Sequence, residues 1–381
     1  MARILHLGKY FPPFAGGIEN FLADLMSAQT RAGDDIAAIV HDHESQSVKF
    51  FHSVQAKNNI YRVPSYGRLL YAPISPHFPF WLNRVLKEFQ PQILHLHLPN
   101  TSAFFVLTLP RAREIPWVIH WHSDVVSIVN KKLAVAYHVY RPFEQMLLKH
   151  AHTIIATSPP YLESSAALRN WQHKCRVIPL GIDKTRLPEP TATDWAEQQW
   201  QVNKIRLLNI GRLTYYKGHE TLINAVAKVD NAQVIIIGKG ELQHSLTKLI
   251  TKLNLQDKVK LFGYCDDQQL IALLSSCDCF CLSSLERTEA FGVVLLEAMR
   301  YAKPIVVKEI VGSGVTWVVK DAGLIVSQSD SLADALQKIS EDDDLRKKLG
   351  QIGQKRFEQL FDIKNVAIEM SKLYETILQA D

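Results

Sequence analysis

The chain has 381 residues, of which 47% are hydrophobic and 21% charged. This length exceeds what one hydrophobic core usually supports, and the composition excludes disordered and fibrous classes, so we expect two globular domains. No apolar run reaches the roughly 20 residues of a bilayer span, and the N-terminal segment lacks the features of a signal peptide, which predicts a cytoplasmic protein.

The net charge of +5 is unevenly distributed along the chain. Residues 1–180 hold 18 Lys and Arg against 11 Asp and Glu, whereas residues 181–381 hold 25 against 27. A basic first half is compatible with a phosphorylated substrate, an anionic membrane or nucleic acid, and also with an ordinary solvated surface. Nucleic acid ranks last, because the basic residues are dispersed rather than clustered with aromatic ones.

Short apolar runs of strand length alternate with helix-like segments in the first half. The expected strands are residues 2–8, 36–41, 92–97, 117–122 and 153–158. The loop "KYFPPFAGG" follows the first of them and leads into a helical pattern that ends at Gly33. Because the runs are continuous rather than alternating, they predict strands buried on both faces of a parallel, doubly wound sheet.

The same pattern restarts in the second half. The expected strands there are residues 205–211, 232–238, 258–263, 277–283 and 303–308. Residues 183–203 are the predicted linker, and the C-terminal tail has a helical period. We therefore expect an α/β protein of two Rossmann-like domains, 1–182 and 183–360, with a helix at 361–381 returning to the first domain. The carboxyl ends of both sheets would face a shared crevice, where such folds bind ligands.

The five cysteines are an odd number in a large chain, which argues against a secreted disulfide framework. Three of them, Cys277, Cys279 and Cys281, alternate in "CDCFC" and would point to one face of a strand. No histidine or second cysteine pair lies nearby, so we interpret them as small buried hydrophobes rather than metal ligands.

Two loops offer sites for anions. "IGRLTYYKG" places Arg212 and Lys217 five residues apart after the first strand of the second half, and a guanidinium and an ammonium on one loop suit a diphosphate. The alternative is two solvated cations. In "AGGIEN", Gly16 and Gly17 begin a helix whose N–H groups could approach an anion, but the pattern is not a dinucleotide fingerprint.

Histidines recur in pairs at strand ends: His41 with His43, His95 with His97, and His120 with His122. Of these, His122 lies nearest the crevice in "VIHWHSDVV", where an imidazole could hydrogen-bond a substrate hydroxyl or act as an acid or base, and Asp124 follows it. The alternative is a packed polar residue. Zinc is less favoured, since no carboxylate or third histidine stands at metalloenzyme spacing.

Two glutamates flank an apolar run in "EAFGVVLLEAM". Glu289 is expected in a strand-to-helix loop and Glu297 about two helical turns later. The separation suits two contacts along one nucleotide-sugar, with Glu289 on the sugar hydroxyls and Glu297 on the ribose. The backbone N–H groups of Phe291, Gly292 and Val293 would face phosphate between them. The alternative, a first-turn charge and a solvated glutamate, explains Glu297 less well.

These motifs together resemble the E-x7-E signature of the retaining glycosyltransferases of family four, which have the GT-B fold. "PPFAGGIE", "VIPLGID", "IGRLTYYKG", "LFGYC", and "EAFGVVLLEAM" with "AKPIVV" follow the family's order over nearly the whole chain. "KEIVGSGVTWVVKDAG" departs from the family's commoner form, so the resemblance implies no role there. Together with "HWHSD", this stretch resembles the branch of the family that builds bacterial surface polysaccharides on lipid-linked acceptors.

The resemblance also implies a function for individual residues. The second domain would bind the donor and the first the acceptor, with His122 and Asp124 near the acceptor. The implied donor-site residues are Gly17, Gly211, Arg212, Lys217, Tyr264, Glu289, Phe291, Gly292, Val293 and Glu297. The base would lie against the backbone around Tyr264. Of these, His122, Arg212, Lys217 and Glu289 are the candidate catalytic residues.

The implied reaction moves a hexose-type sugar from a nucleotide-sugar to a glycan or lipid-linked glycan with retention. Arg212 and Lys217 could neutralise the leaving diphosphate without a metal or cofactor. No D-x-D follows a strand, and "EDDDL" at 341–345 is typical of a charged helix start. The alternatives are a related GT-B phosphorylase, hydrolase or epimerase, and a catalytically silent binder, which the four intact charged residues disfavour.

Two segments of the first half combine aromatic residues with cations, 67–89 and 130–150. The apolar members are Tyr71, Phe78, Phe80, Trp81, Tyr137, Tyr140 and Leu147. Such segments could contact an anionic membrane at its surface. The alternative is that these side chains belong to the core.

Overall fold

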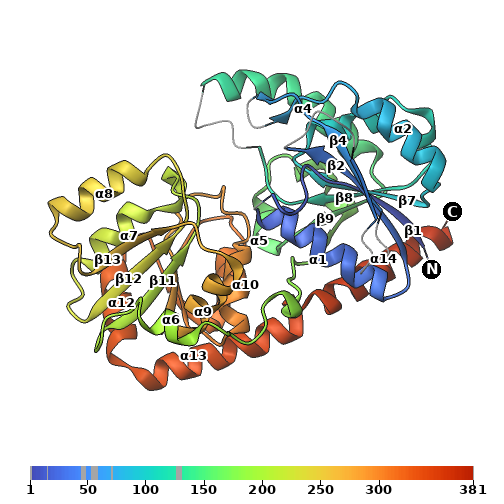
Figure 1. Cartoon of the computed structure of the whole chain (residues 1–381). Helices are drawn as coiled ribbons and strands as arrows, with labels where there is room; N and C mark the ends of the chain where they lie inside the picture. The colour runs from blue at the N-terminus through green and yellow to red at the C-terminus, as the bar shows by residue number, and fades with distance from the viewer. Residues whose placement is uncertain are drawn as a thin grey trace. The chain divides into compact units, whose positions relative to one another are not determined.

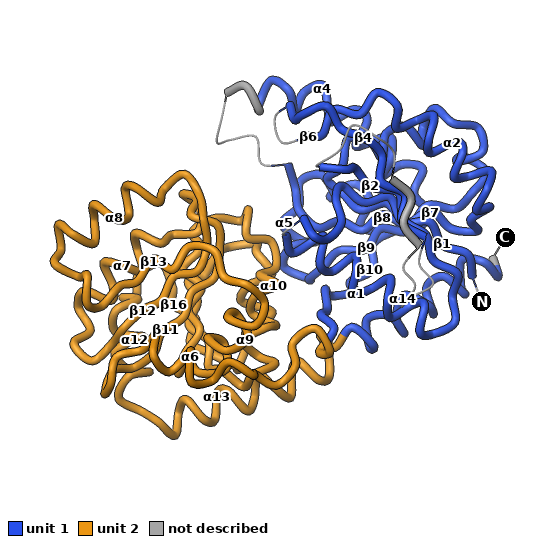
Figure 2. Tube along the Cα trace, in the orientation of Figure 1, with its two compact units in different colours: residues 1–183, 363–381 blue, residues 184–362 orange. Residues whose placement is uncertain are grey.

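The computed structural model describes residues 2–14, 16–43, 49–52, 59–69, 72–125 and 131–380. Tyr71 of the segment 67–89 lies outside these residues. The chain forms two compact units, shown in Figure 2. Unit 1 consists of Met1–Asp183 and Ile363–Asp381, and unit 2 of Lys184–Asp362.

Unit 1 is built on an eight-stranded sheet of order β10-β9-β8-β7-β1-β2-β4-β3 (Figure 1). Its strands are β1 (Arg3–Leu7), β2 (Asp35–Asp42), β3 (Lys49–His52), β4 (Asn59–Pro64), β7 (Ile93–Leu98), β8 (Trp117–Trp121), β9 (Thr153–Ala156) and β10 (Cys175–Val177). Every neighbouring pair is parallel except β3 with β4. A two-stranded hairpin of β5 (Arg68–Leu69) and β6 (Ala72–Pro73) stands apart.

Helices of unit 1 bury apolar stripes on this sheet. They are α1 (Gly17–Arg31), α2 (Phe78–Phe89), α3 (Pro110–Arg113), α4 (Lys131–His150), α5 (Pro159–Ser164) and α14 (Ile363–Ala380), with 3₁₀ turns η1 (Thr101–Leu107) and η2 (Arg169–Lys174). The last of these, α14, packs against α1. Its buried residues Val366, Met370, Tyr374 and Ile377 recur every three to four positions, so one face of the helix completes the core of unit 1.

Unit 2 is a six-stranded, wholly parallel sheet of order β13-β12-β11-β14-β15-β16. Its strands are β11 (Ile205–Ile210), β12 (Ala232–Ile237), β13 (Val259–Gly263), β14 (Cys279–Leu282), β15 (Ile305–Lys308) and β16 (Gly323–Val326). Its helical segments are η3 (Lys184–Arg186), α6 (Thr193–Glu197), η4 (Tyr215–Lys217), α7 (His219–Val226), α8 (Gln243–Lys252), α9 (Asp267–Ser276), α10 (Val293–Arg300), α11 (Val315–Val319), η5 (Lys320–Ala322), α12 (Leu332–Glu341), α13 (Asp343–Arg356) and the π-turn η6 (Phe357–Phe361). The predicted fold class, two doubly wound domains with a helical tail, is confirmed.

Several predictions about single segments can be judged against these elements. Cys277, Cys279 and Cys281 are free and buried, which confirms their interpretation as small hydrophobes, and burial raises the pKa of the Cys281 thiol to about 12. The charged helix start is also confirmed, because the Asp342 side chain caps α13 by accepting from the Leu345 N–H at 2.8 Å. The strands β3, β4, β5, β6, β10 and β16 were not predicted, and β3 makes the first sheet mixed rather than purely parallel.

The prediction of a linker at 183–203 is wrong for most of its length. The chain leaves unit 1 at Asp183, whose N–H donates to Asp24 Oδ2 at 3.0 Å and whose carboxylate pairs with Arg31 at 2.6 Å. Further on, Trp200 is buried and donates to Ser276 Oγ at 2.9 Å. An indole buried against α9 makes this segment part of unit 2.

Candidate active site

The loop after β11 carries Arg212 and Lys217, and several contacts hold its backbone in place in unit 2. It runs from Gly211 through η4 to Gly218, whose φ of +66° is a conformation that favours glycine. A Cβ on Gly218 would lie 2.1 Å from the carbonyl oxygen of Ser283, so a side chain cannot fit there. The Ser283 hydroxyl in turn donates to the Lys217 carbonyl at 2.9 Å. These contacts fix the loop after β11 against the loop after β14.

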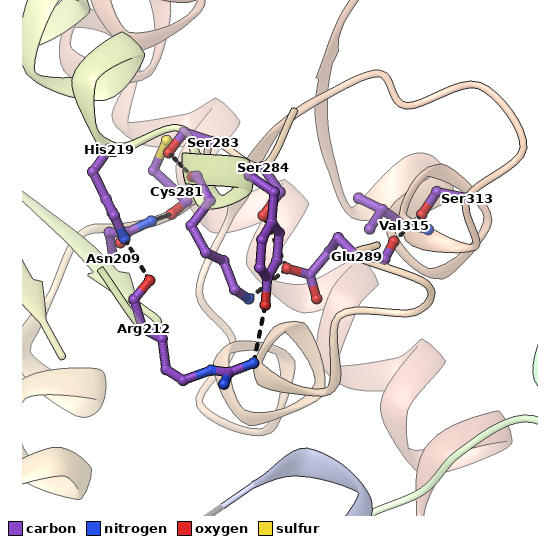
Figure 3. Close-up of polar contacts among 11 residues, drawn as sticks. Asn209, Arg212, His219, Cys281, Ser283, Ser284, Glu289, Ser313 and Val315 are labelled. Carbon is purple, nitrogen blue, oxygen red and sulfur yellow. Dashed lines mark hydrogen bonds and ion pairs between the residues drawn. The ribbon is translucent and has the colours of Figure 1, made fainter. Parts of the chain in front are cut away.

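Lys217 and Glu289 meet across these two loops (Figure 3). Lys217 Nζ lies 2.5 Å from Glu289 Oε2, and both side chains are nearly buried, with 13% and 11% of their surface exposed. Ser284 Oγ donates to the same carboxylate oxygen at 2.9 Å. An ammonium carries three donors, so Lys217 can keep this carboxylate and still bind an anion.

Arg212 lies on the same loop and is exposed. Its carbonyl accepts from His219 Nε2 at 3.0 Å, and burial lowers the pKa of that imidazole, which keeps it neutral. Within the described residues, the guanidinium has one polar contact, a long one of 3.4 Å to Tyr216 Oη. The backbone of Arg212 is therefore fixed while its side chain retains donors for a ligand.

The backbone of the Glu289 loop is held from a third loop, after β15. Ser313 Oγ donates to the Glu289 carbonyl and accepts from the Val315 N–H at 3.2 Å. The Gly314 N–H donates to the Ala290 carbonyl at 2.8 Å. Residues 308–323, to which the sequence assigned no role, thus position Glu289. Ser283, Ser284 and Ser313 were missed because hydroxyls on three separate loops carry no spacing signal.

Helix α10 begins directly after this loop, at Val293, and Gly292 is its N-cap. This glycine has φ +78°, and a Cβ would lie 2.8 Å from Leu295 Cδ1. In the part of the chain that the structure describes, the N–H groups of Gly292 and Val293 donate no hydrogen bond, as is usual in the first turn of a helix. The ring of Phe291 is buried, with its centroid 6.5 Å from that of Trp317 and 6.0 Å from that of Phe361.

Two other predicted donor-site residues lie apart from this cluster of charges. Glu297 is buried on α10, and its Oε1 is 3.7 Å from Arg186 Nη2, so its charge is already partly compensated. Tyr264 follows β13 and is 72% exposed, with Lys239 Nζ 5.5 Å from the centre of its ring.

In unit 1 the predicted residues lie at the carboxyl ends of β1 and β8. Gly17 is the exposed first residue of α1. His122 is buried after β8, and burial lowers its pKa to about 3, so it is neutral at physiological pH. Asp124 Oδ1 accepts from Trp121 Nε1 at 2.8 Å and Ser165 Oγ at 2.6 Å. That oxygen therefore has a structural role as well.

No third histidine stands at metalloenzyme spacing in the sequence, but the fold brings further histidines close to the His-x-His pairs. Within the described residues, His6, His95 and His97 form one group with possible ligand geometry, and His97, His120 and His122 another. These residues are distant in sequence and become neighbours through the pairing of β1, β7 and β8.

Two surface hollows of about 400 and 630 Å³ lie elsewhere on unit 2, around Tyr301 and around Trp200. Neither is lined by a predicted site residue, and we assign them no part in the site. Among the described residues, no helix combines the length and hydrophobicity that crossing a bilayer requires.

The sequence matches two family models. One, described as "Glycosyl transferase 4-like domain", matches residues 16–181, and the other, "Glycosyl transferases group 1", matches residues 192–356. The chain is 27% identical to O-antigen chain mannosyltransferase C of Escherichia coli, covering 99% of each chain. It is 29% identical to the D-rhamnosyltransferase WbpZ of Pseudomonas aeruginosa, covering 94% of this chain and 92% of the relative.

A solved structure shares the fold over the full length. The sucrose-phosphate synthase of Thermosynechococcus elongatus superposes with a TM-score of 0.83 at 24% identity and covers 100% of both chains. The two family models, one on each unit, and the shared architecture agree with the resemblance found in the motifs. The chain belongs to the glycosyltransferases of the GT-B fold that pair a glycosyl transferase 4-like domain with a group 1 domain.

Proposed function

We propose that the protein transfers a hexose-type sugar, with retention and without a metal, from a nucleotide-sugar to a glycan or lipid-linked glycan of the cell surface. Unit 2 binds the donor and unit 1 the acceptor. The observation that carries this proposal is the arrangement of Arg212, Lys217, Glu289 and the open N-terminus of α10 on adjoining loops of unit 2. The full-length relatives named for O-antigen mannosyl transfer and D-rhamnosyl transfer support the surface-polysaccharide assignment.

Each element of the donor site suits one part of a nucleotide-sugar. The guanidinium of Arg212 and the ammonium of Lys217 bind the diphosphate, together with the N–H groups of Gly292 and Val293. Glu289, which Lys217 and Ser284 hold in place, accepts hydrogen bonds from the hydroxyls of the donor sugar. Glu297 binds the ribose and Tyr264 lies beside the base.

In the proposed reaction, the bond between the anomeric carbon and the diphosphate oxygen breaks, and its electron pair leaves with the diphosphate. The acceptor oxygen bonds to the same face of the anomeric carbon, and its proton passes to the departing phosphate oxygen. The negative charge that develops on the leaving group is the main electrostatic cost of this step. Arg212 and Lys217 reduce that cost, as preorganised charges do in other transfer enzymes.

The acceptor is lipid-linked if unit 1 contacts the cytoplasmic face of the membrane, and α4 offers a surface for that contact. Val135, Val139, Phe143 and Met146 are 70%, 67%, 46% and 45% exposed, and their spacing places them on one side of the helix. Arg141 and Lys149 are exposed on the same helix. Of the residues first considered for this role, Phe78 and Leu147 are buried in the core, whereas Phe80 is 65% exposed. Apolar side chains beside cations suit an anionic interface.

A panel of UDP-, GDP-, ADP- and dTDP-sugars tests the proposed function. The matching donor should raise the melting temperature, because it binds the native state. It should also support transfer to a lipid-linked glycan with an unchanged anomeric configuration and full rates in EDTA. Inversion, or loss of activity in EDTA that Mg²⁺ or Mn²⁺ restores, would refute the proposed mechanism. Failure of every donor to bind would refute the function.

A further inference from the structure

One face of the unit 1 sheet holds five buried histidines on three neighbouring strands. The register pairs His6 with His95 and His97 with His120, which places them on the same side, and His122 follows β8. All five are at most 3% exposed. Gln29 of α1 and Tyr374 of α14 are buried and hydrogen-bond to His6 and His95 on this face, and both helices belong to unit 1.

A continuous chain of hydrogen bonds joins the two helices to His122. Gln29 Nε2 donates to Tyr374 Oη at 3.2 Å, and Gln29 Oε1 lies 3.0 Å from His6 Nε2. His6 Nδ1 lies 3.0 Å from His97 Nε2, and His97 Nδ1 lies 2.9 Å from His122 Nε2. Every member is buried, so the side chains depend on one another for their partners.

Each imidazole in this chain is neutral and therefore has one donor and one acceptor nitrogen. Burial lowers the pKa of His6 to about 4 and that of His122 to about 3, and it also lowers the pKa of His97 well below its usual value. A carbonyl oxygen on Gln29 can only accept, so His6 carries its proton on Nε2. Nδ1 of His6 then accepts from the Nε2–H of His97. In the same way, Nδ1 of His97 accepts from the Nε2–H of His122, so all three rings carry their proton on Nε2.

This polarity leaves a lone pair on Nδ1 of His122, an atom that is buried and has no hydrogen-bond partner among the described residues. The reverse polarity would place an N–H there instead. Buried donors without an acceptor are rarer than under-satisfied acceptors, which favours the first arrangement. The lone pair is thus the free end of the chain, and a ligand hydroxyl would satisfy it.

We propose that Gln29, His6 and His97 are positioning residues that hold His122 in the neutral Nε2–H tautomer, so that its Nδ1 accepts a hydrogen bond from a sugar hydroxyl of the acceptor. The identity of the hydroxyl rests on the proposed function. A metal ion is the competing occupant of the cluster. However, the ring nitrogens that join His6 to His97 and His97 to His122 lie 3.0 and 2.9 Å apart, as hydrogen-bonded partners do.

Two-bond proton–nitrogen correlations on the full chain with ¹⁵N-labelled histidine test the tautomer. His122 of the wild type should be a single Nε2–H tautomer. If the wild type instead shows an Nδ1–H tautomer or an imidazolium at neutral pH, that result alone overturns the proposal. Gln29→Met and His6→Phe should convert the single tautomer to a mixture. The matched control is His120→Phe, because His120 is equally buried on the same face and neither ring nitrogen has a hydrogen bond. An unchanged single tautomer in both chain-breaking variants would contradict the relay.

Kinetics and metal titration complete the test. Gln29→Met should raise the acceptor KM roughly tenfold, the effect of one hydrogen bond, and leave nucleoside diphosphate binding unchanged. A changed tautomer with an unchanged acceptor KM would refute the positioning role. If the wild type transfers no sugar, the proposed function fails while the tautomer result stands independently. Stoichiometric Co²⁺ binding that His97→Phe abolishes would overturn the relay in favour of a metal site.

Discussion

The two units share one architecture but place their polar chemistry differently. In unit 1 the central strands β1, β7 and β8 carry five imidazoles inside the fold. In unit 2 the buried side chains of β12, β14 and β15 are mostly aliphatic or thiol, and the charges lie in the loops after the strands. A buried group far from water is kept neutral and can only hydrogen-bond, whereas a loop can hold a charge for an anionic ligand. This difference agrees with the proposal that unit 1 binds hydroxyls of the acceptor and unit 2 the diphosphate of the donor.

The largest effect that this comparison predicts is acid lability confined to unit 1. The folded pKa values of its buried histidines are depressed, to about 4 for His6 and about 3 for His122, so the unfolded state binds more protons below its pKa of 6.5. Their stabilisation is complete above pH 6.5 and is lost as the pH falls towards 4. Each histidine contributes about 1.4 kcal/mol per pH unit in that window.

Hydrogen exchange measured on peptides of each unit at pH 7 and pH 5 checks this expectation. The backbone amides of unit 1 should lose several kcal/mol of protection between pH 7 and pH 5. Those of unit 2 should change little, because His219 is the one described histidine of that unit with a depressed pKa. His120→Phe removes one titrating group and should flatten the slope. Equal losses in both units would show that the histidines are not the cause.

The second effect concerns the charges of unit 2. Lys217→Ala should lower turnover by roughly 100-fold or more, because it removes a charge that stabilises the leaving diphosphate. The control is Lys252→Ala, an exposed lysine at the end of α8. Lys217→Ala also leaves the carboxylate of Glu289 without its partner, which could destabilise the fold. The double variant Lys217→Met with Glu289→Gln removes both charges together, so a loss of turnover in it does not arise from an unpaired carboxylate. Near-normal turnover in both would refute the assignment.

The third effect separates the two glutamates. Glu297→Ala should weaken the free nucleoside diphosphate and the nucleotide-sugar alike, by roughly tenfold, because it removes hydrogen bonds to the ribose. Glu289→Ala should weaken only the nucleotide-sugar, since the freed Lys217 still binds phosphate. Glu286→Ala, which removes the carboxylate that accepts from Tyr215 Oη at 3.0 Å, is the control on the same loop. Calorimetric titration with both ligands distinguishes these outcomes, and equal losses in Glu289→Ala would refute the division.

The smallest effect concerns the surface of α4. Val135→Ser combined with Val139→Ser should reduce association with anionic vesicles severalfold, because two exposed apolar side chains no longer insert at the interface. Val202→Ser is the matched control, since Val202 is 84% exposed on unit 2. Co-sedimentation at low and high salt measures the effect. If the wild type does not bind at low salt, a soluble acceptor replaces the lipid-linked one.

Sequence patterns predicted most strands and the loops that carry Arg212, Lys217 and Glu289, because buried parallel strands are continuous apolar runs. Among the strands that they missed are β16, where "GLIV" is short, and β3, which is an antiparallel edge strand. They also missed the histidine cluster. Each pair was interpreted alone, whereas the cluster depends on the register of three strands and on Gln29 and Tyr374, which are 345 residues apart. The Lys217–Glu289 pair spans 72 residues and was likewise visible only in the fold.

The claim that unit 2 binds the diphosphate and unit 1 contributes neutral hydrogen bonds is tested most directly by one titration. The nucleoside diphosphate that stabilises the wild type should be titrated calorimetrically into wild type, Lys217→Ala and His122→Phe. The account predicts that Lys217→Ala weakens binding at least tenfold and that His122→Phe leaves it unchanged. Full affinity in Lys217→Ala together with lost affinity in His122→Phe would contradict it.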